Sequence, residues 1–342
     1  MSVFGAPIAW GRSAASGIFQ NEPEPFNPFE SGSRPQLVDP SGLEIRCGKN
    51  VFRRGKLLGR GSSCVVFEYA SGDGRSLAVK SFFKSHGAAA ELERKFFGRN
   101  GISDPSFLRG LFLENFLVME RAPRTLGSMP PLSELQAVRV ALALAADARS
   151  VWDSRKLIYT DLKPENVGCF KNRVVFLDVA SFFKLDAASP TVSATNRPPG
   201  YGQKAVPQLF AYALGRLILS ISEPGEQLRK AMFPAQYASS EERVNTARWE
   251  EALRRAEAES NSYALDFAKQ QAEQDGYVAS APPDVAFATY WEQDAPQFSR
   301  NARAPLKKLL LFDRQLVDIQ DPARVFERVS AMLQRWADAL SP

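Results

Sequence analysis

One short stretch constrains this chain more than any other part of the sequence. Residues 157–168 read Leu-Ile-Tyr-Thr-Asp-Leu-Lys-Pro-Glu-Asn-Val-Gly and follow an apolar, helix-forming segment. A short turn and a β-rich run at 174–181 come next and end in Leu-Asp-Val-Ala-Ser. Because elements joined by tight turns bring their ends together, Asp161, Asn166 and Asp178 are expected on adjacent loop ends. Two carboxylates and an amide in one place suit chemistry on phosphate groups.

A glycine-rich hairpin is predicted well upstream of these loops. Residues 56–67 read Lys-Leu-Leu-Gly-Arg-Gly-Ser-Ser-Cys-Val-Val-Phe, and a Gly-Asp-Gly turn precedes the run Leu-Ala-Val-Lys at 77–80. Short β-like runs separated by glycine turns predict three consecutive strands. The Gly-x-Gly alone is weak evidence for nucleotide binding, because any tight hairpin can use glycine for a positive φ angle.

Together these segments resemble the glycine-rich, catalytic and metal-binding loops of eukaryotic-type protein kinases. The resemblance covers roughly residues 57–219 and is strongest around Asp161 and Asp178. It implies an α+β, bilobal fold, with a small β-rich N-lobe that has one main helix and a larger, mostly helical C-lobe. The predicted parts are a disordered or extended N-terminal arm at 1–46, the N-lobe at 47–122 and the C-lobe at 123–342.

The resemblance also implies a role for each candidate site residue. Asp161 would orient the substrate hydroxyl and accept its proton, and Lys163 would lie on the transferring phosphoryl group. Asn166 and Asp178 would hold Mg²⁺, and the third-strand Lys80 would bridge two phosphates of ATP. The predicted nucleotide contacts come from the glycine-rich strands and the connection between the lobes: Leu58, Gly59, Gly61, Val66, Ala78, Lys80, Met119, Glu120 and Ala122.

A helix predicted at 88–97 would supply the acidic partner of Lys80. Its residues favour helix formation throughout, and glycines follow it. Glu91 is the better candidate partner and Glu93 the alternative. Either glutamate, taken alone, would ordinarily be a solvated helix charge.

The rest of the chain predicts a mostly helical C-lobe. Ser133 and Gln136 have the spacing of a capping box at the start of a helix that leads to the catalytic loop. A charged, helix-prone stretch at 239–276 either packs on the surface or binds a partner. Other elements are two strands at 107–115 and 116–120, a buried central helix at 209–221 and closing helices at 304–312 and 322–340.

Several positions depart from the family pattern. Tyr159-Thr160 replaces the usual His-Arg, Val179-Ala180 replaces Phe-Gly, and Cys64 replaces the third glycine of the loop. The leucine that normally forms the adenine floor aligns with Gly168, and the aspartate that usually begins the central helix is missing. These changes favour the alternative of a pseudokinase with little or no phosphoryl transfer.

Thr160 also bears on regulation. In many kinases an arginine at this position helps to bind a phosphate on the activation segment, because guanidinium pairs bidentately with phosphate. Thr160 carries no charge, and the segment from Asp178 to Gly200 is short. We therefore predict activity without phosphorylation at Ser189, Thr191 or Ser193, and inhibition by modification of Thr195.

Composition limits the alternatives. The chain has 342 residues, 44% of them hydrophobic, which is enough for a sizeable core. Its net charge of +5 is modest and no basic run stands out, so nucleic-acid binding is not indicated. Three cysteines without metal-ligand spacing predict free thiols in a reducing compartment. No early or long apolar segment predicts export or a membrane span, so a cytoplasmic or nuclear location is expected.

The favoured function is therefore an ATP- and Mg²⁺-dependent protein kinase. Lys163 favours serine and threonine as acceptors, because the resemblance places a lysine there in that class. The main alternative is a pseudokinase scaffold that binds partners, through the aromatic N-terminal arm or through 239–276, with little or no phosphoryl transfer. A kinase-like enzyme acting on a small molecule is a weaker third possibility.

Overall fold

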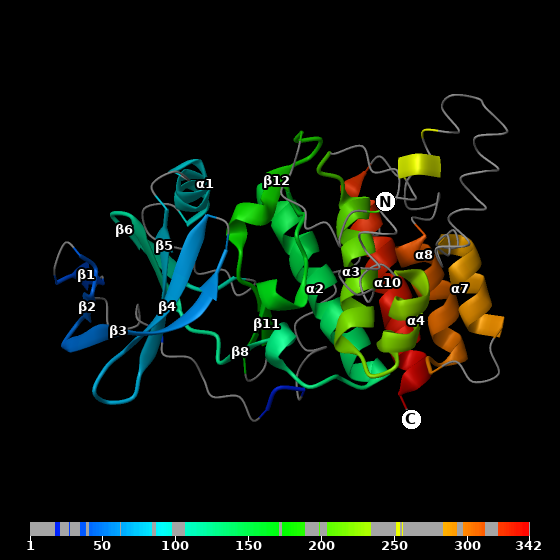
Figure 1. The fold of residues 1–342 in the computed structure, drawn as a ribbon, viewed down its shortest axis with the longest axis horizontal. Coiled ribbons are helices and arrows are strands. Elements are labelled where there is room, and N and C mark those ends of the chain that lie inside the picture. Colours follow the sequence, from blue (N-terminus) through cyan, green and yellow to red (C-terminus); the bar gives the residue numbers. More distant parts are fainter. Residues whose placement is uncertain are drawn as a thin grey trace, which may run out of the picture.

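The described chain forms a β-rich part and a larger helical part, side by side (Figure 1). This arrangement confirms the predicted α+β, bilobal class. The computed structural model describes residues 18–20, 27, 35–38, 41–61, 63–83, 87–97, 107–170, 173–188, 198, 204–233, 251–253, 255, 283–292, 297–311 and 321–341.

One antiparallel sheet of seven strands makes up most of the N-lobe. Its strand order is β1-β2-β3-β4-β5-β7-β6. The predicted glycine hairpin is the β3–β4 turn, where the Gly61 N–H donates a 2.9 Å hydrogen bond to the Cys64 oxygen. The strands are β1 (Gln36–Leu37), β2 (Glu44–Cys47), β3 (Asn50–Arg60), β4 (Cys64–Ala70), β5 (Ser76–Phe82), β6 (Gly110–Leu113) and β7 (Phe116–Glu120).

The sheet begins earlier than predicted. Strands β1 and β2 pair with each other, and β2 pairs with β3, so the folded part reaches into the range predicted as an arm. Strands of 2 and 4 residues are too short to show a clear period in the sequence. Pairing with neighbouring strands supplies most of their stability. Phe19, also in that range, is 2% exposed and belongs to the main hydrophobic core.

Helix α1 (Gly87–Phe97) packs against the sheet with the ring of Phe97 over Gly110 of β6. A Cβ atom on Gly110 of β6 would lie only 2.7 Å from the Phe97 ring, so glycine is required there. Glu93 lies one turn before Phe97 and therefore faces the same way. The close packing thus sets which side of α1 meets the strands.

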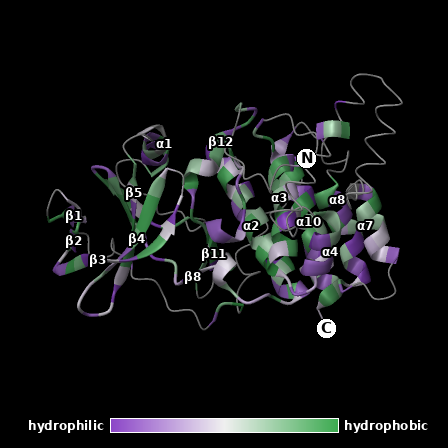
Figure 2. Ribbon diagram, in the orientation of Figure 1, coloured by the Kyte–Doolittle hydropathy of each residue, from purple (hydrophilic) through white to green (hydrophobic). Residues whose placement is uncertain are grey.

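The C-lobe is built around α3 (Pro207–Ile221), whose central residues are buried on all sides. Figure 2 shows hydrophobic residues along α3 and along β4. Helix α2 (Glu134–Arg155) begins at a capping box in which Ser133 and Gln136 exchange hydrogen bonds, as predicted. The remaining described helices are α4 (Gly225–Met232), α7 (Pro283–Glu292), α8 (Arg303–Leu310) and α10 (Pro322–Leu340).

Short strands between the lobes carry the loops of interest. Strand β10 (Val167–Phe170) pairs with β11 (Arg173–Phe176) and with β8 (Arg124–Thr125), while β9 (Leu157–Tyr159) pairs with β12 (Phe182–Lys184). Single helical turns connect them: η2 (Leu126–Ser128), η3 (Pro164–Asn166), η4 (Val179–Ser181) and, further on, η7 (Arg300–Ala302).

Some predictions concern residues outside the described part of the chain. These include the possible phosphorylation sites Ser189, Thr191, Ser193 and Thr195 and most of the stretch 239–276. The three cysteines are free and buried. Among the described residues, no helix combines the length and apolar character needed to cross a bilayer.

Candidate active site

The predicted catalytic loop follows β9 and is held together by its own side chains. Asp161 is only 3% exposed. Lys163 Nζ lies 2.8 Å from Asp161 Oδ2, and Asn166 Nδ2 donates a 2.9 Å hydrogen bond to the backbone oxygen of Asp161. Three residues predicted to act around the phosphoryl group are therefore in contact, with Asp161 at their centre.

The second loop is joined to the first through the β10–β11 hairpin. The Leu177 N–H donates a 2.9 Å hydrogen bond to the Asn166 oxygen, so Asp178 starts its loop beside Asn166. Ser181 Oγ donates a 3.0 Å hydrogen bond to Asp178 Oδ2. The structure thus brings Asp161, Asn166 and Asp178 to adjacent loop ends, as the sequence predicts.

Lys80 of β5 links the two lobes at this point. Its Nζ lies 3.2 Å from Asp178 Oδ1 and forms a direct ion pair with Glu93 Oε1. Lys80 is 7% exposed and Glu93 1% exposed, so both charges are buried. The strand that carries Lys80, helix α1 and the Asp178 loop therefore meet through one buried ammonium group.

Glu91, the favoured partner of Lys80, is the wrong residue. Its side chain is 54% exposed and lies 3.7 Å from Arg94 on the outer surface of α1. Residues two apart on a helix point in nearly opposite directions, so only one of the two glutamates can face Lys80. The packing of Phe97 against Gly110 turns Glu93 inward.

The buried charges shift one another's pKa values. Burial alone would lower the pKa of Lys80, but Glu93 and Asp178 outweigh it and the pKa is raised. Burial raises the pKa of Asp178, yet Lys80 and the Ser181 hydroxyl more than offset this, so its pKa is lowered. Burial raises the pKa of Glu93 to about 7, because Lys80 offsets only part of the desolvation. At neutral pH, Lys80 and Asp178 are both charged.

Tyr159, which replaces the usual histidine, joins an aromatic cluster. Its ring centroid lies 4.6 Å from that of Phe176 and 4.7 Å from that of Phe182. Phe182 in turn lies 5.3 Å from Phe96 of α1 and 5.3 Å from Phe107. The cluster connects the catalytic loop to α1, the helix that carries Glu93.

Thr160, which replaces the usual arginine, is fully buried. Its N–H and its hydroxyl both donate to the Ser181 backbone oxygen, at 3.0 and 3.1 Å. The catalytic loop is therefore fixed directly to the turn after Asp178. A neutral side chain makes this connection without any phosphate group.

The predicted nucleotide contacts from the N-lobe lie on β3, β4, β5 and β7. Ala78 and Met119 are 6% and 5% exposed, and Val66 is partly buried against the core. Leu58 is 39% exposed. A Cβ on Gly59 would meet no atom within 4 Å, so the hairpin is uncrowded at that point.

At Gly61, on the same hairpin, a Cβ would make only an ordinary contact with Cys64 Sγ at 3.8 Å. Cys64 itself is 6% exposed, so its side chain is turned into the protein.

Leu177 is a residue that the sequence analysis missed. A Cβ on Gly168 would lie 2.7 Å from Leu177 Cδ2 and 3.0 Å from the Cβ of Ala122. Leu177 thus fills the space that a side chain at position 168 would occupy, next to the connection between the lobes. The only sequence signal was an apolar residue directly before Asp178.

Glu120, predicted to contact adenine through its backbone, uses its side chain elsewhere. The carboxylate is buried, accepts a 3.1 Å hydrogen bond from the Arg109 N–H and pairs with Arg173 at 3.3 Å. It therefore fastens β7 to β11 at the connection between the lobes.

The residues present fit a magnesium–nucleotide complex. Asn166 and Asp178 offer amide and carboxylate oxygens from two joined loops, and hard oxygen ligands are what Mg²⁺ requires. Asn166 donates its amide hydrogens to Asp161, so the catalytic loop fixes the orientation of its side chain. Among the described residues, no group of three or more His, Cys, Asp and Glu side chains forms a separate metal site.

The bilobal fold and the contacts among Lys80, Asp161, Asn166 and Asp178 agree with those that the motif resemblance predicts. No protein-family model matches the sequence, and no curated protein matches it.

Two solved kinase domains are similar in structure. The ROP18 kinase domain in complex with AMP-PNP and sucrose is 14% identical, over 90% of this chain and 86% of that chain, with a TM-score of 0.48. A Toxoplasma gondii specific rhoptry antigen kinase domain is 13% identical, over 96% and 91%, with a TM-score of 0.49.

Proposed function

We propose that this protein is an ATP- and Mg²⁺-dependent protein kinase that phosphorylates serine or threonine hydroxyls, inside the cell. The observation that carries the proposal is the position of Lys80, whose ammonium contacts both Glu93 and Asp178. This buried network lies beside a loop in which Lys163 contacts Asp161. Phosphoryl transfer needs mainly such positioning and charge stabilisation, with little covalent chemistry from the protein.

Each residue has a task in this proposal. Asp161 orients the acceptor hydroxyl and takes its proton, and Lys163 stabilises the charge on the transferring group. Lys80, fixed by Glu93, binds nucleotide phosphates. Magnesium bound with ATP would neutralise phosphate charge, and Asn166 and Asp178 would hold it.

A transfer assay tests the proposal. The protein is incubated with Mg²⁺, ATP labelled on the γ-phosphate and a generic basic protein. Asp161→Asn is expected to lower turnover roughly a thousandfold, in the range of a lost general base and positioning group. ATP should still raise the melting temperature of the variant, since a ligand that binds only the folded state stabilises it. Equal labelling by both proteins would refute the proposal.

A pseudokinase scaffold is the second candidate, favoured by one observation. The polar atoms of Asp178 already have protein partners in Lys80 and Ser181. If these contacts persist with nucleotide, ATP would bind without transfer, and function would reside in partner binding. Asp178→Asn separates the two cases. If the protein is a kinase, Asp178→Asn should lose both Mg²⁺-dependent ATP binding and phosphoryl transfer. If it is a scaffold, wild type and Asp178→Asn should each bind ATP equally with and without Mg²⁺.

A further inference from the structure

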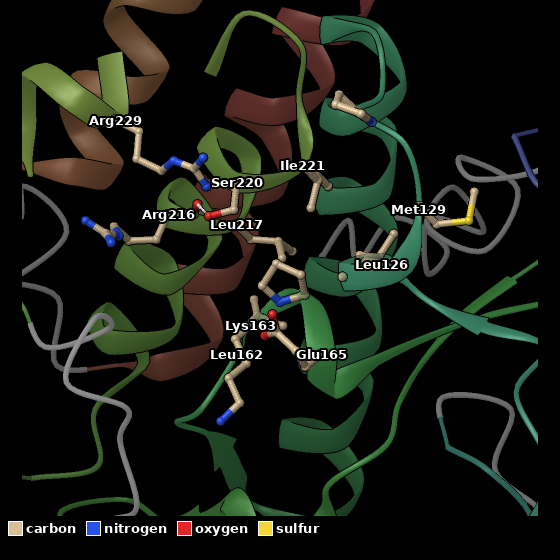
Figure 3. A pocket seen from close by; sticks show the side chains of 13 residues that line it. Leu126, Met129, Leu162, Lys163, Glu165, Arg216, Leu217, Ser220, Ile221 and Arg229 are labelled. Carbon is tan, nitrogen blue, oxygen red and sulfur yellow. Dashed lines mark hydrogen bonds between the residues drawn. The ribbon is translucent and has the colours of Figure 1, made fainter. Parts of the chain in front are cut away.

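A cavity of about 280 Å³ lies directly beside the catalytic loop (Figure 3). Leu162 and Lys163, the two residues after Asp161, form part of its wall, together with Glu165. Further residues come from η2, α3 and α4. Because Lys163 Nζ contacts Asp161 at 2.8 Å, the cavity borders the position where the acceptor hydroxyl would react.

Cationic side chains outnumber anionic ones in this wall. Lys163, Arg216 of α3 and Arg229 of α4 line it, against the single carboxylate of Glu165. Glu165 is exposed, so water screens its charge. In Figure 3, Arg229 extends toward Ser220, on the side of the cavity opposite Lys163 and Glu165.

The two arginines differ in how they are held. Arg216 is 4% exposed, and its guanidinium lies 3.5 Å from the ring centroid of Phe233, which does not line the cavity; in Figure 3 the Arg216 side chain extends away from Ser220. Arg229 is half-buried on the short helix α4. A half-buried guanidinium is partly desolvated, and its planar donors suit carboxylate and phosphate oxygens.

We propose that this cavity binds an anionic side chain of the protein substrate, a carboxylate or a phosphate, with Arg229 as the main receptor. The proposal rests on the proposed kinase function and adds a substrate class to it. Because Lys163 both contacts Asp161 and lines the cavity, a residue close in sequence to the acceptor hydroxyl would lie within reach of the cavity. The enzyme therefore selects acceptors that lie near an acidic or already phosphorylated residue.

The test uses short peptides with one central serine in an alanine and glycine background. Glutamate, phosphoserine, glutamine or arginine is placed at each flanking position in turn, and kcat/KM is measured. At one or more positions, glutamate or phosphoserine should exceed glutamine roughly tenfold or more, as a charge-assisted hydrogen bond would give. A larger effect of phosphoserine than of glutamate would identify phosphate as the preferred group.

Arg229→Gln should remove this preference, so that kcat/KM for the glutamate and phosphoserine peptides equals that for the glutamine peptides in the variant. Lys230→Gln is the matched control, because Lys230 is the next residue of α4, is exposed and pairs with Glu226 at 2.7 Å. It should keep the wild-type preference. Ser220→Asp adds a carboxylate where Arg229 points, and should shift preference toward the arginine peptides.

Two results would overturn the proposal: equal kcat/KM for glutamate, phosphoserine and glutamine peptides at every position, or equal loss in Arg229→Gln and Lys230→Gln. If no peptide is phosphorylated, the proposed kinase function fails, and fluorescence anisotropy of the same labelled peptides then decides about the cavity. If the acidic peptides bind more tightly than the neutral ones, and Arg229→Gln removes this difference, the cavity binds anionic side chains even without catalysis. Equal binding of acidic and neutral peptides would reject it.

Discussion

The glycine-rich hairpin and the catalytic loop border the same predicted nucleotide site but are built in opposite ways. On β3, Leu57 and Leu58 are 53% and 39% exposed. In the catalytic loop, Tyr159, Thr160 and Asp161 are 1%, 0% and 3% exposed. Side chains crowd the catalytic loop and leave the hairpin open.

The difference in burial suggests that the catalytic loop holds its side chains in fixed positions, whereas the hairpin can change its conformation. Catalytic groups held by several contacts need no reorganisation during the reaction, which lowers the barrier to transfer. A segment with few buried contacts opens and shifts at low cost, as is common for parts that cover ligands. The proposed function therefore predicts a catalytic loop that keeps its arrangement when nucleotide binds and a hairpin that moves.

The strongest test of this contrast compares two glycines. Gly168→Ala should destabilise the protein by about 1–3 kcal/mol, the usual cost of overpacking, because the new methyl group meets Leu177. Gly59→Ala should change stability by less than about 0.5 kcal/mol, since nothing lies near its Cβ. Chemical denaturation of both variants measures the difference. Similar losses in the two would break the contrast.

A smaller effect is expected at Thr160. Thr160→Val keeps the shape of the side chain but removes the hydroxyl that donates to Ser181, at a cost of about 1 kcal/mol. Thr160→Ser keeps the donor and serves as its control. Urea unfolding should show the valine variant to be the less stable, and the reverse order would mean that packing of the methyl group, rather than the hydrogen bond, fixes the loop.

The smallest effect concerns pH. Glu93 has a folded pKa of about 7, above the ordinary value of a glutamate. Its stabilising contribution is therefore present at acidic pH and lost as the pH rises through about 7. The difference in unfolding free energy between wild type and Glu93→Gln should thus decrease from about pH 5 to about pH 8. A difference that stays constant over this range would show that Glu93 does not titrate there.

Predictions from the sequence were confirmed where residues close together in the sequence determine the local structure. The capping box at Ser133, the glycine hairpin and the antiparallel pairing of β10 with β11 are set by residues close in sequence, and the structure contains all three. The placement of Asp161 beside Asn166 follows from that same short-range order.

Predictions from the sequence were wrong or incomplete where contacts between residues distant in the sequence determine the structure. Glu93 rather than Glu91 faces Lys80 because Gly110, on a later strand, lets Phe97 approach and so fixes the rotation of α1. Leu177 occupies the space over Gly168 because a hairpin folds the two residues together. Strand β1 was missed because only its pairing with β2 makes it a strand.

The most direct test of the central claim measures γ-phosphoryl transfer by protein treated with a phosphatase. Thr160 and Ser181 join the two loops without a phosphate group, so the treated wild-type protein should keep the rate of the untreated protein. Asp161→Asn, treated in the same way, should transfer roughly a thousandfold more slowly. Loss of the wild-type rate after treatment, or equal rates in wild type and Asp161→Asn, would contradict a catalytic loop that is assembled without phosphorylation.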